Sequence, residues 1–487
     1  MMKRQVKHIR WIGFAVLAGF AVLAAVIALF RGPNRLENAS DLYPLQSAVL
    51  ITIDTLRADS LGFSGHPRIR SPVLDRLSQR STVFSEAYSN LPLTLPAHSA
   101  MFTSRFPVEM NVRTNFDYVP DGYVRLPEML RDLGFRTAGF PQAILSFPRG
   151  THVGFDMYDK MDLNDRKTVP NTKRIPNPRV LMEAKSRNIM IEEERIERVI
   201  TWVRERDQRG EKYFLWLHLF EPHAPYAPRA PYRYLDPLVS NESTDDVIYR
   251  LSSLWRVKGH AFSDEDQNVS RRLYANEIVW TDGLVDPLLR FLTYQTRDHP
   301  FIMITSDHGE CLYDSADYFG HGYSLLREEL HVPMLIHDPR PVADRTSRQP
   351  VVSSQRIQSV DVSPTILGAL GLSPPDRFRG RDIRDLSDPD RLIPCSISTI
   401  DSLVGIVGPA GILTLNPSSG EWTLTSTEDP EGTGFMSSDK SLPDFLQPMM
   451  ALALEYASLN SSSMQTETAP PEDPGFMDML KNLGYLQ

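Results

Sequence analysis

The sequence predicts an α/β protein with a mostly parallel central sheet, helices on both faces of that sheet, and a smaller α+β subdomain toward the C-terminus. Apolar runs of strand length recur along the first 340 residues, and amphipathic helical segments lie between them. Acidic residues and histidines follow several of these runs directly. Because ligands of open parallel sheets bind beyond the carboxyl ends of the strands, these residues are the first candidates for a functional site.

Four apolar runs are predicted to form buried strands of the sheet. The first is AVLITID, which begins at Ala48 and is bounded by Asp54. The others are YFLWLHLF at 213–220, FIMITSD at 301–307 and VPMLIHD at 332–338.

Helical periodicity separates these runs and supplies the layers that cover the sheet. Two polar stretches, 160–188 and 234–268, interrupt the pattern and are predicted to be surface insertions. The predicted helical segments are 71–80, 126–135, 191–206 and 285–296.

Helical periodicity fades after about residue 395, where shorter β-like runs begin (LVGIVG, ILTLN, EWTLTS). We expect a small subdomain over 395–457. Serine, proline and acidic residues predict a flexible segment at 458–475, and 476–487 is predicted to form a last amphipathic helical turn.

The N-terminus predicts a membrane anchor. Basic residues in 1–10 precede an uncharged run at 11–30, which is long enough as a helix to cross a bilayer core of roughly 30 Å. The basic side is expected to stay cytoplasmic, so the chain beyond the polar linker at 31–47 is expected to be extracytoplasmic, in the periplasm or at the cell surface. A cleaved signal peptide is the alternative, although no small-x-small motif precedes the linker.

Composition excludes some classes of protein and leaves one question open. The net charge of −9 argues against a nucleic-acid-binding protein, whose surface carries a basic excess. The two cysteines, Cys311 and Cys395, are too few for a disulfide framework and match no zinc motif. Whether they form one bridge is not decided by the sequence.

Residue types that bind metals gather at the ends of the predicted strands. Each such residue taken singly is more often structural, but several clusters in one sheet indicate a shared site. Oxygen and imidazole ligands together favour zinc or manganese, with calcium and magnesium as alternative divalent ions. The candidates are Asp54, Glu221, His223, Asp307, His308 and His321.

A loop around Thr94 adds a candidate nucleophile. Thr94 and His98 flank Pro96, and 97–104 is predicted to begin a helix. A hydroxyl at a helix N-terminus lies at the positive end of the helix dipole, which also suits an anionic substrate. Coordination to a metal ion would lower the pKa of this hydroxyl and produce an alkoxide. The structural alternative is that Thr94 only caps the helix or forms a turn.

Ordered motifs along the chain resemble the sulfatase family of the alkaline phosphatase superfamily. They cover about 48–385 and the terminal LKNLGYL, which implies a catalytic domain over 48–394. The motifs include VLITIDTLRADSLGFSG, TLPAHSAMFTSRFP, FLWLHLFEPHAPY, YANEIVWTD, SDHGE, HGYSLLREELHVPMLIHDP and VDVSPTILGALGL.

The resemblance assigns roles by position. Asp54, Asp307 and His308 resemble metal ligands of the family, and Thr94 falls at the nucleophile position. His223 resembles a histidine that contacts the substrate or a second ion. His321 occupies another such active-site position.

Three positions depart from typical sulfatases. His98 stands where they place an arginine, and Thr55 replaces the second of two consecutive aspartates, which weakens the case for a calcium-type cage of oxygens. Typical sulfatases convert a cysteine or serine nucleophile to formylglycine, whereas Thr94 carries a methyl group on its β-carbon and cannot form that aldehyde. In having a threonine at the nucleophile position, the chain resembles nucleotide pyrophosphatases, phosphoethanolamine transferases and lipoteichoic acid synthases. This resemblance favours phosphoryl chemistry.

The resemblance implies hydrolysis or transfer of an anionic ester, phosphate or sulfate, whose other part is free or linked to a lipid or glycan. An arylsulfatase-like sulfuric ester hydrolase is the second hypothesis, and a catalytically inactive envelope-binding protein is the third. Arg113, Asn115 and Glu221 are candidates for substrate binding, with ordinary structural roles as the alternative. His218 is predicted to be a core residue or to support a ligand, and Arg57 is predicted to pair with Asp59.

Overall fold

The computed structural model describes residues 45–159, 178–227, 247–248, 250–251, 254, 260–340, 350–384, 388–397, 402–426, 436–437 and 442–462. The predicted anchor at 11–30, the linker up to residue 44 and the terminal turn at 476–487 lie outside these residues. Within the described residues, no helix combines the length and the apolar character needed to cross a bilayer.

An eight-stranded sheet forms the centre of the fold, with the strand order β10-β2-β9-β6-β1-β5-β3-β4. All neighbouring strands run parallel except β9, which is antiparallel to both β2 and β6. The prediction of a mostly parallel sheet is therefore confirmed. The strands are β1 (Ser47–Ile53), β2 (Thr82–Tyr88), β3 (Arg136–Phe140), β4 (Met157–Tyr158), β5 (Tyr213–Leu219), β6 (Phe301–Thr305), β9 (Met334–His337) and β10 (Val351–Gln358).

The antiparallel direction of β9 follows from what connects it to β6. Parallel neighbours need a crossover connection, usually a long helix. Between β6 and β9 the chain forms only a hairpin of two short strands, β7 (Cys311–Leu312) and β8 (Phe319–Gly320), and the four-residue helix α9 (Arg327–Leu330).

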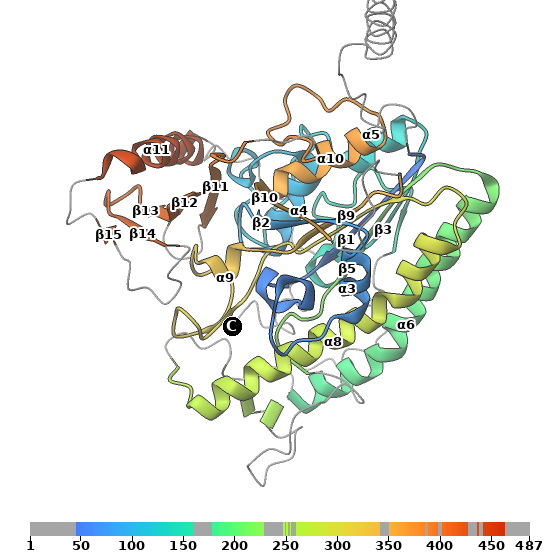
Figure 1. Ribbon diagram of the computed structural model, residues 1–487, viewed down its shortest axis with the longest axis horizontal. Helices are drawn as coiled ribbons and strands as arrows, with labels where there is room; N and C mark the ends of the chain where they lie inside the picture. The colour runs from blue at the N-terminus through green and yellow to red at the C-terminus, as the bar shows by residue number, and fades with distance from the viewer. Residues whose placement is uncertain are drawn as a thin grey trace, which may run out of the picture. The chain divides into compact units, whose positions relative to one another are not determined.

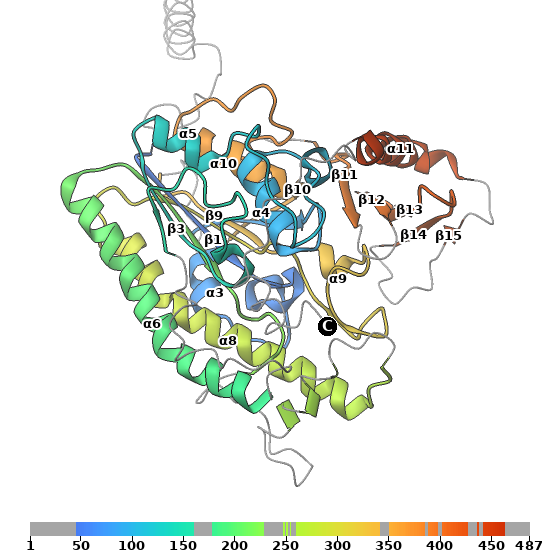
Figure 2. The ribbon, with the colours of Figure 1, turned by 180° about the vertical axis from the view of Figure 1, so that it is seen from behind.

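Helices cover both faces of the central sheet, as predicted (Figures 1 and 2). Alternation along β1 sends Val49, Ile51 and Ile53 into one core and Ala48 and Leu50 into the other. The first core also takes residues from α3 (Pro72–Ser78), α6 (Pro178–Arg209) and α8 (Asp264–Tyr294). The second takes residues from α4 (Thr94–Thr103), α5 (Leu126–Asp132) and α10 (Val362–Ala369).

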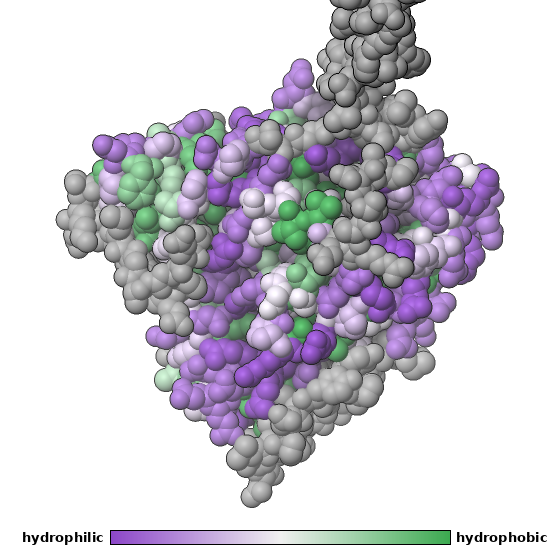
Figure 3. All heavy atoms as spheres, in the orientation of Figure 1, coloured by the Kyte–Doolittle hydropathy of each residue, from purple (hydrophilic) through white to green (hydrophobic). Residues whose placement is uncertain are grey.

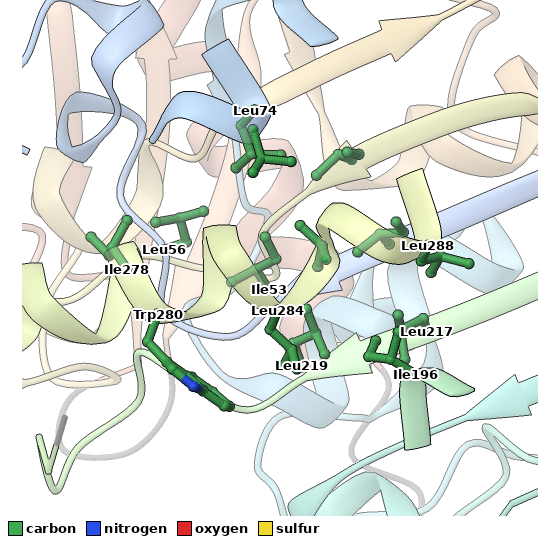
Figure 4. Close-up of a cluster of buried hydrophobic side chains, with 14 of the residues drawn as sticks. Ile53, Leu56, Leu74, Ile196, Leu217, Leu219, Ile278, Trp280, Leu284 and Leu288 are labelled. Carbon is green, nitrogen blue, oxygen red and sulfur yellow. The ribbon is translucent and has the colours of Figure 1, made fainter. Parts of the chain in front are cut away.

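In the first core, the two longest helices, α6 and α8, pack against one face of the sheet. Figure 4 shows Ile53, Leu217 and Leu219 from the sheet against Leu284 and Leu288 from α8. At about 1.5–3 kcal/mol for each fully buried aliphatic side chain, this layer stabilises the end of β1 at which the candidate site lies.

Two long helices extend into stretches that the sequence predicts to be insertions. Residues 178–188 belong to α6 and 264–268 belong to α8, so the prediction is wrong for these parts. The start of α8 carries a signal that explains the difference, because the side chain of Ser263 accepts a hydrogen bond from the Asp266 N–H as an N-cap.

A second, antiparallel sheet of five strands follows, in the order β11-β12-β13-β14-β15, and the predicted β-like runs form β12, β13 and β14. The last helix continues to residue 462, so 458–462 is helical rather than flexible, and 463–475 lies outside the described residues. These elements are β11 (Ile393–Ile397), β12 (Leu403–Gly408), β13 (Gly411–Leu415), β14 (Trp422–Thr425), β15 (Met436–Ser437) and α11 (Gln447–Ser462).

The visible face of the molecule is largely hydrophilic, with apolar side chains gathered near the C-terminal elements (Figure 3). Phe445 and Leu454 of the C-terminal elements are exposed. Cys311 and Cys395 are both buried and unpaired, which answers the question that the sequence leaves open. Short 3-10 helices complete the fold at Ala58–Ser60, Gly62–Ser64, Pro107–Met110, Ala143–Ser146, Ser359–Asp361 and Asp444–Leu446.

Candidate active site

The strand ends of β1 and β6 bring the first candidates together. These strands are parallel neighbours with Thr52 opposite Thr305, so Asp54 and Asp307 emerge at the same end of the sheet. The turn after Asp54 is strained, because Thr55 has a positive φ of 56° that β-branched residues rarely adopt. This conformation lets the Thr55 N–H donate to Asp307 Oδ1 over 3.3 Å.

Asp54, Asp307 and His308 form a buried group whose ligand atoms all lie within 4.8 Å of one another. His308 Nε2 lies 3.7 Å from Asp54 Oδ1 and 3.5 Å from Asp307 Oδ2. Neither oxygen of Asp54, nor Asp307 Oδ2, accepts a hydrogen bond from any residue that the structure describes. Three buried carboxylate oxygens that accept no hydrogen bond from the described residues are costly unless a cation compensates their charge, so this donor set fits a divalent metal ion.

The electrostatics of the group point the same way. Burial raises the pKa of Asp54 well above its usual value, and the charges of Asp307, Glu310 and Glu221 raise it further. Burial lowers the pKa of His308 to about 4, so its imidazole is neutral at pH 7 and has a lone pair for a metal. A bound cation would therefore supply the positive charge that stabilises the ionised carboxylates.

Thr94 joins this group from the other side. It is the first residue of α4, and its Oγ1 lies 3.4 Å from His308 Nε2. The predicted start of this helix near residue 97 is wrong by one turn. Pro96 fits the first turn because a proline there gives up an N–H that would have no partner inside the helix.

His98 lies one turn further along α4 and is fully buried. Its Nδ1 is 2.8 Å from the Thr94 carbonyl oxygen and 3.8 Å from Asp307 Oδ2. Burial lowers the pKa of His98, so the ring is a neutral support for the Thr94 backbone.

Three imidazoles lie next to one another at the edge of the group. The ring of His321 is 4.2 Å from that of His308 and 5.0 Å from that of His223, measured between centroids. His321 Nδ1 lies 3.3 Å from Oε1 of the buried Glu310, which orients the ring. His223 stacks on Phe220 at 4.5 Å.

The candidates for substrate binding, Asn115, Glu221 and Arg113, do not all lie beside Asp54. Asn115 is buried and accepts a hydrogen bond from the Leu95 N–H over 2.9 Å, which places it at the start of α4. Glu221 is buried and close enough for its charge to raise the pKa of Asp54. The backbone N–H of Arg113 donates to Asp117. Burial lowers the pKa of the Arg113 guanidinium, and Asp117 and Tyr456 of α11 act against this shift.

Sequence reasoning missed the roles of Thr52, Trp216 and Glu310, and it set His218 apart from the ligands. The available signal was alternation, because Thr52 lies two residues before Asp54 and shares its side of β1. Trp216 is fully buried and donates from Nε1 to Thr52 Oγ1 over 3.0 Å. The predicted pairing of Arg57 with Asp59 is confirmed at 2.6 Å.

Comparisons with known proteins identify the family of this chain. The family model described as Sulfatase matches residues 46–372. An ulvan-active sulfatase from Formosa agariphila is 24% identical over 352 residues, which is 70% of this chain and 65% of that protein. Arylsulfatase K from Canis lupus familiaris is 21% identical over 395 residues, 75% of this chain and 71% of that protein.

Solved structures share the fold. BT4656, in complex with its substrate D-glucosamine-2-N,6-O-disulfate, has a TM-score of 0.64 at 15% identity and covers 87% of this chain and 100% of its own. The phosphonate monoester hydrolase of Agrobacterium radiobacter has a TM-score of 0.63 at 17% identity and covers 88% and 100%. The chain therefore belongs to the sulfatase family and is a hydrolase of the sulfatase and alkaline phosphatase superfamily.

Proposed function

We propose that this chain is a metal-dependent hydrolase or transferase of anionic esters that uses Thr94 as its nucleophile. The observation that carries the proposal is the position of Thr94 Oγ1, 3.4 Å from His308 Nε2 at the N-terminus of α4. The hydroxyl thus lies beside a buried group of carboxylates that calls for a cation. A helix N-terminus at this point also favours an anionic substrate.

Asp54, Thr94, Asp307 and His308 would hold the divalent ion, which supplies a lowered hydroxyl pKa and neutralises a nonbridging oxygen of the substrate. One imidazole with carboxylate and hydroxyl oxygens favours zinc or manganese. Thr55 offers no second carboxylate, so calcium and magnesium are the less favoured alternatives.

In the proposed cycle the Thr94 alkoxide attacks the phosphorus or sulfur atom, and the bond to the ester oxygen breaks. His321 or His223 gives a proton to the departing oxygen. Water or an acceptor alcohol then attacks the phosphorus or sulfur atom bonded to Thr94. The bond to Thr94 Oγ1 breaks, Thr94 leaves as the alkoxide, and the proton of the water or alcohol passes to the imidazole that gave one up in the first step. The Asn115 amide, which accepts a hydrogen bond from the Leu95 N–H, would hold the transferred group at the start of α4.

Phosphoryl or phosphonyl chemistry is favoured because Thr94 cannot become formylglycine. The shared fold with phosphonate monoester hydrolases is compatible with this preference. Sulfate-ester hydrolysis is the second candidate, and the names of the curated relatives support it. If a glycan carries the ester, as in the complex of BT4656, the glycan would bind outside the buried group.

Thr94→Ala tests the nucleophile, with Thr103→Ala in the same helix as the matched control, since Thr103 Oγ1 bonds only to groups within its own segment among the described residues. Turnover of aryl phosphate, aryl phosphonate and aryl sulfate is measured with each metal. We expect loss of turnover in Thr94→Ala and retention in Thr103→Ala. Wild-type turnover in Thr94→Ala would contradict the assignment, and a preference for aryl sulfate would favour the second candidate.

We also propose that residues 11–30 anchor the chain in a membrane, with the catalytic domain outside the cytoplasm. The supporting observation is the basic cluster before an uncharged run of bilayer length. In spheroplasts, external protease should digest the catalytic domain of the full chain, and alkaline washing should leave it with the membrane. Protection from protease, or release by the wash, would contradict this topology.

A further inference from the structure

A hydroxyl on the central strand connects the candidate site to a histidine on the neighbouring strand. Thr52 on β1 and His218 on β5 are register partners, and both are fully buried. Thr52 Oγ1 lies 3.0 Å from each of three nitrogen atoms, which are His218 Nδ1, His98 Nε2 and Trp216 Nε1.

The number of protons available fixes the direction of each of these bonds. A hydroxyl donates one hydrogen bond and accepts two, and an indole N–H can only donate. Trp216 therefore occupies one lone pair of Thr52. His98 Nδ1 donates to the Thr94 carbonyl oxygen, so in the neutral ring Nε2 has a lone pair and receives the single hydroxyl proton of Thr52.

One acceptor position of Thr52 is left, and His218 Nδ1 must fill it as a donor. The neutral His218 ring then has a lone pair on Nε2. That nitrogen lies 3.4 Å from Asp54 Oδ2, and neither atom has a hydrogen-bond partner among the described residues. Two buried lone pairs at this distance repel unless a cation binds both.

The 3.4 Å separation of His218 Nε2 from Asp54 Oδ2 fits coordination of one ion by these two atoms. Two ligand atoms about 2.1 Å from a tetrahedral ion lie roughly 3.4 Å from each other. The neighbouring separations, Thr94 Oγ1 to His308 Nε2 at 3.4 Å and His308 Nε2 to Asp307 Oδ2 at 3.5 Å, are of the same size. Binding would draw the His218 ring further toward Asp307 and His308, because the group of ligand atoms that lie within 4.8 Å of one another holds Asp54, Asp307 and His308 but not His218.

We infer that His218 is a further ligand of the cation in the Asp54 site, with its Nε2 lone pair directed there by the Thr52 hydroxyl. The inference rests on the proposed function only through that cation. His218 would provide a nitrogen ligand in a site where position 55 is a threonine rather than a carboxylate. Thr52 would then be a positioning residue, because its hydroxyl orients the His218 ring. The opposite tautomer, with Nε2 donating to Asp54, would require Thr52 to donate two protons.

The test is X-ray absorption spectroscopy of the full chain loaded with one zinc or cobalt ion. We expect two imidazoles per ion in the wild type and one in His218→Asn, whose amide can keep the donor to Thr52 but lacks the second nitrogen. Metal affinity, measured by chelator competition, should fall at least 10–100-fold in His218→Asn. His331→Asn is the matched control, since His331 is a histidine bonded to the Ser85 carbonyl oxygen, and it should keep both values.

Thr52 provides a second pair of variants that tests the relay. Thr52→Ser keeps the hydroxyl and should keep the affinity, whereas Thr52→Val should lower it. If the chain binds a divalent ion, three results would overturn the inference. These are one imidazole per ion in the wild type, two imidazoles per ion in His218→Asn, and equal metal affinities for Thr52→Ser and Thr52→Val. A wild-type chain that binds no divalent ion would instead overturn the proposed function as well.

Discussion

Glu329 holds the loop that carries His321, and its replacement gives a measurable prediction. This fully buried carboxylate accepts hydrogen bonds from the hydroxyls of Tyr318 and Ser324 and from the backbone N–H groups of Gly322 and Tyr323. Glu329→Leu removes four hydrogen bonds worth about 1 kcal/mol each, two of which come from backbone N–H groups of the loop. We therefore expect the free energy of unfolding to fall by about 4 kcal/mol or more.

The assay is urea denaturation of the purified chain, followed by kinetics under native conditions. Because the lost bonds flank His321, kcat should fall in Glu329→Leu even where the protein is fully folded. Glu328→Leu is the matched control, since Glu328 is partly exposed and hydrogen-bonded to Ser315. A loss below 1 kcal/mol in Glu329→Leu, with unchanged kcat, would refute the reasoning.

The same carboxylate should make stability depend on pH. Burial raises the pKa of Glu329 from 4.5 to about 7. A carboxyl whose pKa is higher in the folded state favours folding below its unfolded pKa, and this contribution is lost as the pH rises through 7. Between pH 4.5 and 8 the wild type should lose roughly 3 kcal/mol of stability relative to Glu329→Gln, which cannot ionise. Parallel pH profiles for the two proteins would contradict this.

Three further outcomes are expected. Because Asp54 has a raised pKa in the metal-free chain, metal binding should release a proton and affinity should rise with pH, which calorimetry in buffers of different ionisation enthalpy measures; an enthalpy independent of the buffer would contradict it. Arg391→Met breaks a buried bidentate pair with Asp361 and should lower the free energy of unfolding, measured by urea denaturation, by about 3–5 kcal/mol. A loss of less than about 1 kcal/mol, as for a solvated pair, would contradict this. Gly309→Ala places a Cβ in steric overlap with the Glu328 carbonyl oxygen, so it should displace the segment after His308 and weaken metal binding. Chelator competition measures this, and an unchanged affinity would contradict it.

Much of the fold could be predicted because its strands are buried on both faces. Continuous apolar runs such as AVLITID and FIMITSD are typical of central parallel strands, and their ends at Asp54 and Asp307 were visible as abrupt changes to polar residues. The direction of β9 was not visible, because its run looks like that of a parallel strand and only the length of the connection decides it.

The candidate site was predictable where residues end a strand and less so where they lie inside one. His218 and Thr52 are within apolar runs, where a polar residue is usually a satisfied part of the core. Their relation depends on strand register, which pairs positions 166 residues apart and which no local pattern encodes. The helix begins at Thr94 rather than at 97, because its first turn accommodates Pro96.

Strand β9 has a consequence for the order in which the protein is assembled during synthesis. It is the only strand joining β2 to β6 within the described sheet, and β2 leads directly into the helix that begins at Thr94. A nascent chain that has not yet delivered Met334–His337 from the ribosome therefore has no sheet contact between its nucleophile half and its carboxylate half. The Thr94 hydroxyl should therefore reach Asp54, Asp307 and His308 only after this late segment inserts, so the metal ligands after β1 and β6 come together before the nucleophile joins them.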